Sequence, residues 1–135
     1  MRPARLVRGL RFAVLAALAL TAAWLVWRFD KVSLPARAES PLLDVPAGSG
    51  LIVDRHPRDP LAGDVWLFRG PRGELLIGRV AAPPAGLTEA AEQALAAGAV
   101  WLTADRTNVP AVDSRLLGPI ADTRLEGRVV WVLEP

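Results

Sequence analysis

The chain has 135 residues, no cysteine, one histidine and a formal net charge of +2. This composition excludes disulfides, thiolate metal sites and multi-histidine metal sites, and we expect no metal and no cofactor. Residues 1–38 hold seven basic and one acidic residue (+6), whereas residues 39–135 hold nine basic and 13 acidic residues (−4). Because the main part of the chain is mildly acidic, we expect no nucleic-acid partner.

The first predicted element is a transmembrane helix over residues 12–27. These 16 residues (12 through 27) carry no charge and are bounded by arginine on both sides. The run is shorter than the ~20 apolar residues that usually cross a bilayer, but the arginines can snorkel, and Trp24 and Trp27 suit the interface. Four arginines precede the run. They predict a single-pass protein of the cell membrane with residues 1–11 in the cytoplasm and the C-terminal domain outside it.

A cleaved signal peptide is the alternative to this anchor. Ala36-Arg37-Ala38 fits the small-x-small pattern of a cleavage site. The motif begins nine residues beyond Trp27 (36 − 27), which is a long separation for such a site. We therefore expect the anchor to remain attached, with residues 28–39 as a linker that leads the chain off the membrane.

The sequence predicts a mainly β domain over residues 40–135. Runs rich in β-branched, aromatic and other apolar residues between glycines and prolines predict strands at 50–54, 64–68, 74–80, 99–103 and 128–133. The R-G-P-R-G turn predicts that the second and third strands form a hairpin. One soluble helix is predicted over 87–98, with Thr88 as its N-cap and Gly98 at its end. The three tryptophans of the strands, Trp66, Trp101 and Trp131, are expected in the sheet core.

Several short motifs follow one another in this domain. In chain order they are Gly48–Arg55 (GSGLIVDR), Gly63–Phe68 (GDVWLF), Ile77–Val80 (IGRV), Trp101–Arg115 (ending in DSR) and Leu125–Trp131 (LEGRVVW). Behind an N-terminal anchor, their order and spacing resemble the conserved boxes of type I signal peptidases, which are membrane-anchored serine proteases with a Ser–Lys dyad. The resemblance covers about residues 9–135, without the larger β insertion of many members. It implies a small signal-peptidase-like β domain after a single transmembrane helix.

The resemblance implies that Ser40 is the nucleophile. In the family, the serine lies eight positions before a glycine, and counting back from Gly48 leads to Ser40. The surrounding residues depart from the family, because Pro41, Leu43 and Asp44 stand where it has Met, Pro and Thr. The alternative interpretation is that Ser40 is an ordinary linker serine.

The general base that the resemblance requires is missing. The position of the family's lysine holds Gly78, and glycine cannot accept the proton that a serine hydroxyl must lose. Arg79 stays protonated and cannot replace the lysine. Lys31 and His56 are the remaining candidates in the chain, and the sequence leaves open an unknown protein partner that supplies a base.

The last box keeps Asp113, Ser114 and Arg115 but is altered elsewhere. Ala111 stands where the family has a serine that helps to hold the lysine, and the family's G-D-N reads A-D-R at 104–106. An Asp and an Arg two positions apart on an extended segment lie on one face and can pair. We interpret Asp113, Ser114 and Arg115 as structural support of the site.

Three functions stay open. The first is a serine endopeptidase that acts on signal peptides of exported preproteins at the membrane lipid, weak or inactive because Gly78 replaces the base. The second is a non-catalytic relative that binds peptides or partners at the membrane surface. The third is a small exported β domain unrelated to proteases. Whether the chain is an enzyme therefore depends on the groups that surround Ser40.

Overall fold

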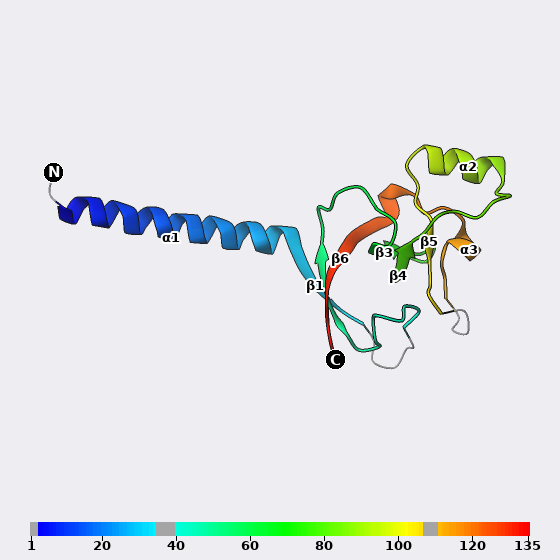
Figure 1. The fold of residues 1–135 in the computed structure, drawn as a ribbon, viewed down its shortest axis with the longest axis horizontal. Helices are drawn as coiled ribbons and strands as arrows, with labels where there is room; N and C mark the ends of the chain where they lie inside the picture. Colours follow the sequence, from blue (N-terminus) through cyan, green and yellow to red (C-terminus); the bar gives the residue numbers. More distant parts are fainter. Residues whose placement is uncertain (1–2, 35–39, 107–110) are drawn as a thin grey trace.

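An N-terminal helix extends away from a small β domain (Figure 1). The computed structural model describes residues 3–34, 40–106 and 111–135. Helix α1 (Pro3–Arg28) contains the predicted span and continues N-terminally through three arginines, which are good helix formers. Within the described residues, it is the one helix long and apolar enough to cross a membrane, and none of its apolar stretch is buried against the domain.

The domain is built on a six-stranded antiparallel sheet with the strand order β1-β2-β6-β3-β4-β5. The strands are β1 (Phe29–Ser33), β2 (Gly50–Asp54), β3 (Val65–Arg69), β4 (Leu75–Val80), β5 (Leu102–Thr103) and β6 (Leu125–Leu133). Strands β3 and β4 form the hairpin that the R-G-P-R-G turn predicts. The part of the chain beyond α1 is thus mainly β, as the sequence predicts.

Strand β1 differs from the linker predicted over residues 28–39. It follows α1 without a gap and pairs with β2 along its whole length, from Phe29 opposite Asp54 to Ser33 opposite Gly50. The segment F-D-K-V-S gives a weak strand signal by itself, so pairing with β2 decides its conformation. Residues 35–39, which include the predicted cleavage motif, lie outside the described residues.

Of the helical elements in the domain, the sequence predicts the one that has a clear N-capping residue. Helix α2 (Glu89–Ala96) is the predicted soluble helix, and the Thr88 side chain accepts a hydrogen bond from the Ala91 amide at 3.3 Å. The other two elements, helix α3 (Ser114–Leu117) and the 3₁₀ turn η1 (Asp122–Arg124), were not predicted. Both are too short to produce a periodic pattern.

Two apolar clusters occupy opposite faces of the β3–β4 hairpin, because side chains alternate along a strand. The first cluster consists of Leu42, Val45, Leu51, Val53, Leu67 and Ile77. The second consists of Trp66, Phe68, Val100, Leu102 and Ile120. Trp66 and Trp101 are buried as expected, but Trp131 is 66 % exposed, so its predicted place in the core is wrong. The β6 side chains that pack against the first cluster are those of Val129 and Val132, and Trp131 is not among them.

Candidate functional site

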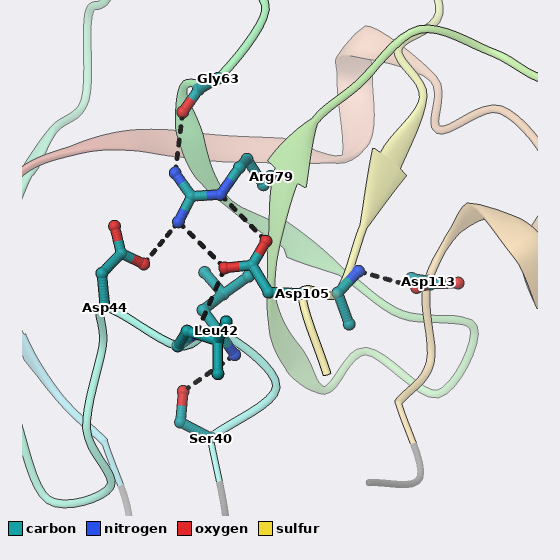
Figure 2. A network of polar contacts seen from close by, with 9 residues as sticks. Ser40, Leu42, Asp44, Gly63, Arg79, Asp105 and Asp113 are labelled. Carbon is teal, nitrogen blue, oxygen red and sulfur yellow. Dashed lines mark hydrogen bonds and ion pairs between the residues drawn. The ribbon is translucent and has the colours of Figure 1, made fainter. Parts of the chain in front are cut away.

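Ser40 begins a turn segment, Ser40–Val45, that packs on the sheet face of the first apolar cluster. The buried side chains of Leu42 and Val45 hold this segment against Leu67 and Ile77. The Ser40 side chain is itself buried, and its Oγ accepts a hydrogen bond from the Leu42 amide at 3.3 Å (Figure 2). Within the described residues this is the hydroxyl's only hydrogen bond. Ser40 therefore caps its own turn, and no described group is placed to take its proton.

Arg79 is the centre of the polar contacts that hold this segment (Figure 2). Its Nε lies 3.1 Å from Asp105 Oδ1 and its Nη2 lies 3.2 Å from Asp105 Oδ2. Nη2 also pairs with Asp44, and Nη1 donates to the Gly63 carbonyl at 3.0 Å. Asp105 Oδ2 in turn accepts from the Leu43 amide at 3.2 Å. One guanidinium thus joins β4 to both the serine segment and the Asp105 loop.

These contacts fix the charges of the network. The hydrogen bonds from Arg79 hold the pKa of Asp105 below its usual value, although burial acts in the opposite direction. The same hydrogen bonds to Asp105 raise the pKa of Arg79. Arg79 is therefore always a cation and Asp105 is an anion near neutral pH. Neither group can act as a general base of useful strength there.

Gly78 faces away from Ser40. A Cβ built on Gly78 would lie 3.0 Å from the Leu102 Cβ and 3.4 Å from the Phe68 Cε1, both in the second apolar cluster. The neighbouring residue Arg79 points to the face of the serine segment, as strand alternation requires. A side chain at position 78 would therefore enter the apolar cluster that lies across the sheet from Ser40.

Asp113 and Ser114 bind the outer edge of β5, the last strand of the sheet. Ser114 Oγ accepts from the Leu102 amide and Asp113 Oδ2 accepts from the Ala104 amide, both at 2.8 Å. Arg115 Nη2 lies 2.7 Å from Asp113 Oδ2, so the expected Asp–Arg pair is present. It forms at the N-cap of α3 instead of along an extended segment. These residues satisfy amides that an edge strand otherwise exposes.

Asp113 is held as an anion by its hydrogen bonds. Burial raises its pKa, but the hydrogen bonds from the Arg115 guanidinium and from two backbone amides outweigh that effect and leave the pKa below its usual value. The carboxylate is fully engaged with Arg115 and the Ala104 amide. Its arrangement is that of a structural residue.

The three segments that the resemblance assigns to the site meet at residues 102–106. The Pro41 carbonyl accepts from the Asp105 and Arg106 amides, each at 3.0 Å, so the serine segment binds one side of this stretch. Strand β4 pairs with it through Arg79 opposite Thr103, and Asp113 binds its edge. The segments converge, but the polar side chain of β4 that contacts Ser40–Val45 is Arg79, beside the apolar Ile77.

The two other candidate bases lie elsewhere. Lys31 is an exposed residue of β1, opposite Ile52 of β2. His56 follows β2 and stacks on Trp27 at the end of α1, with ring centroids 4.0 Å apart. Neither donates to or accepts from the Ser40 hydroxyl in the described structure. The Arg79 network could not be predicted from the sequence, because Asp44, Arg79 and Asp105 belong to three separate motifs.

A shallow groove lies beside the serine segment. Its volume is about 320 Å³, and its lining residues are Asp44, Val45, Gly63, Asp64, Val65, Val129, Val130, Trp131 and Val132. Asp44 and Val45 belong to the serine segment, and the exposed Trp131 is another of the lining residues. The groove combines valine side chains with carboxylates and other polar groups, which suits it to binding a short segment of polypeptide.

Comparisons with protein-family models, with curated proteins and with solved structures found no match to this chain. The resemblance to signal peptidases therefore rests on the order and spacing of the motifs.

Proposed function

We propose that this chain is a membrane-anchored, non-catalytic relative of type I signal peptidases that binds peptide segments of exported proteins at the outer surface of the membrane. The observation that carries the proposal is the surroundings of Ser40. The serine lies where the motif spacing requires, but its hydroxyl accepts only from the Leu42 amide among the described residues. Arg79 is bound to Asp105, and the side-chain direction of Gly78 leads into an apolar cluster. A serine without a proton acceptor is a weak nucleophile.

Binding is supported by the groove beside the serine segment. Five valines are among its lining residues together with two aspartates, and Trp131 is exposed at its side. Exposed tryptophans next to such surfaces often dominate the free energy of binding. The ion pair between Arg79 and Asp44 holds the groove wall formed by Asp44 and Val45 in place. A preorganised wall lowers the entropy lost when a peptide binds.

Two assays separate binding from cleavage. Full-length protein in lipid vesicles is incubated with a preprotein that carries a photoreactive residue just before its signal-peptide cleavage site. We expect crosslinking that falls at least fivefold in Trp131→Ala and persists in Ser40→Ala. No cleavage above the uncatalysed level is expected, because a general base contributes about 10²–10⁴-fold. Trp101→Phe, in the buried core, serves as a control for the loss of a tryptophan.

The results distinguish the functions that the sequence leaves open. Cleavage by the wild-type protein that disappears in Ser40→Ala would establish the peptidase and refute our proposal. Crosslinking that is the same in wild type and Trp131→Ala would exclude the groove as the binding site. Absence of both cleavage and crosslinking would favour a small exported β domain without peptidase ancestry.

A further inference from the structure

The end of α1 is joined to the loop that follows β2 by three sets of contacts. The Trp27 ring stacks on the His56 ring, with centroids 4.0 Å apart and planes inclined by 13°. The Arg28 guanidinium binds Asp54, with Nη2 2.9 Å from Oδ2. The Arg28 carbonyl accepts from the Arg55 amide at 2.9 Å. Asp54 at the end of β2 and the next two residues, Arg55 and His56, thus contact Trp27 and Arg28, the last two residues of α1.

These contacts join the end of α1 to the domain at a second place besides the chain connection through β1. Asp54 is 1 % exposed, and burial raises its pKa, but hydrogen bonds from Arg28 and from the His56 amide outweigh burial and lower it. The carboxylate therefore stays ionised and paired near neutral pH. Because α1 also continues directly into β1, the direction of α1 fixes where this loop lies relative to the bilayer.

The length of the apolar run sets the depth of the loop. The uncharged residues 12–27 extend about 24 Å at 1.5 Å per residue, whereas the hydrocarbon core of a bilayer is about 30 Å thick. A span that is too short thins the bilayer and draws its flanking residues inward. Trp27, the last residue of the run, then lies at the hydrocarbon boundary. The His56 ring, 4.0 Å away, lies in the headgroup layer, which is about 5–7 Å thick on each side.

We infer that the loop Arg55–Asp59 is a second membrane contact, seated in the headgroup layer, with lipid phosphate as the partner of Arg55 and Arg58. Guanidinium groups bind phosphate through paired hydrogen bonds. Arg58 is exposed, and Arg55 is half exposed and forms an ion pair with Asp30, which a lipid phosphate would have to replace or share. The chain leaves β2 next to the end of α1, whereas α2 lies at the far end of the domain (Figure 1). This inference rests on the membrane anchoring that is part of the proposed function.

The absence of native cysteine permits labels at single sites. Three variants of the full-length protein, Asp59→Cys, Ala96→Cys and Val26→Cys, are labelled with a fluorophore and inserted into vesicles of phosphatidylcholine and phosphatidylglycerol. We expect a quencher attached to lipid headgroups to quench the label at 59 at least threefold more than the label at 96 in α2. Equal quenching at 59 and 96 would overturn the inference.

The label at Val26 separates this inference from the anchoring itself. A quencher on the lipid acyl chains should reach position 26, and failure to do so would refute both. If it reaches 26 while 59 and 96 are quenched equally, anchoring stands and only the loop contact is refuted. Adding Arg58→Gln to Asp59→Cys should lower the quenching at least twofold in anionic vesicles. Unchanged quenching would refute phosphate as the partner of Arg58.

Discussion

Replacing Arg79 by methionine should destabilise the domain through loss of the network that holds the serine segment. Methionine keeps the aliphatic stem of arginine and removes its hydrogen bonds. The side chains of Arg79 and Asp105 are 25 % and 22 % exposed. Breaking a buried ion pair costs about 3–5 kcal/mol, and an exposed pair contributes about 0–1 kcal/mol. The intermediate exposure of this pair, with two further acceptors on Arg79, indicates a loss of about 2 kcal/mol.

The matched control is Arg69→Met. Arg69 also pairs with a carboxylate, Glu126, at 2.9 Å and also donates to a carbonyl, that of Gly73, at 2.9 Å. The two side chains of this pair are 49 % and 42 % exposed, so the expected loss is below about 1 kcal/mol.

The assay is thermal unfolding of the full-length proteins in detergent, followed by near-ultraviolet circular dichroism. At about 4–8 °C per kcal/mol for a domain of this size, Arg79→Met should lower Tm by about 8–16 °C. Arg69→Met should lower Tm by less than about 8 °C. Equal decreases in the two variants would refute the conclusion that burial of the Arg79–Asp105 pair makes this network the stronger one.

Two further predictions concern the same domain. Gly78→Lys should lower Tm by more than Arg69→Met and produce no signal-peptide cleavage. The Cβ of the new side chain would approach the Leu102 Cβ to 3.0 Å, and its amine would enter an apolar cluster. A stable variant that cleaves signal peptides would refute this prediction. Stability should fall below about pH 4, because the pKa values of Asp105 and Asp113 are lower in the folded than in the unfolded state. Such carboxylates stabilise the folded state above their unfolded pKa of about 3.9, and this stabilisation is lost as the pH falls through their folded pKa values. Tm measured from pH 7 to pH 2 tests this, and Arg79→Met should show a shallower acid decrease; a Tm that rises below pH 4 would contradict it.

The sequence predicts those elements whose signals are local. The R-G-P-R-G turn and the Thr88 cap each contain the residues that determine the structure, and both predictions are confirmed. Strand β1 could not be predicted, because its conformation depends on pairing with β2, which lies about twenty residues away. The exposure of the Trp131 side chain could not be predicted from the sequence either. Alternation assigns Trp131 to one face of β6, but the presence or absence of cover on that face depends on the tertiary structure.

The site shows the same division between local and distant information. Motif spacing identifies Ser40 and Gly78, but it contains nothing about the face on which the serine segment packs. That face is decided by burial of Leu42 and Val45 against Leu67 and Ile77. Their packing places the serine segment on the face of β4 that carries Arg79. The resemblance selects Gly78, but its neighbour Arg79 makes the polar contacts.

Two positions of β4 face the serine segment: Ile77 packs against Leu42 and Val45, and position 79 makes the polar contacts, so position 79 is where a lysine could stand among polar groups. Even there, its amine would lie beside Asp105 and Asp44, which now bind the Arg79 guanidinium. Opposite charges stabilise the protonated amine and raise its pKa, whereas a general base near neutral pH needs a neutral amine. The two aspartates that stabilise the segment are thus incompatible with a lysine base. The Arg79 network therefore holds the serine segment in place, and it supplies no described group that could activate the serine.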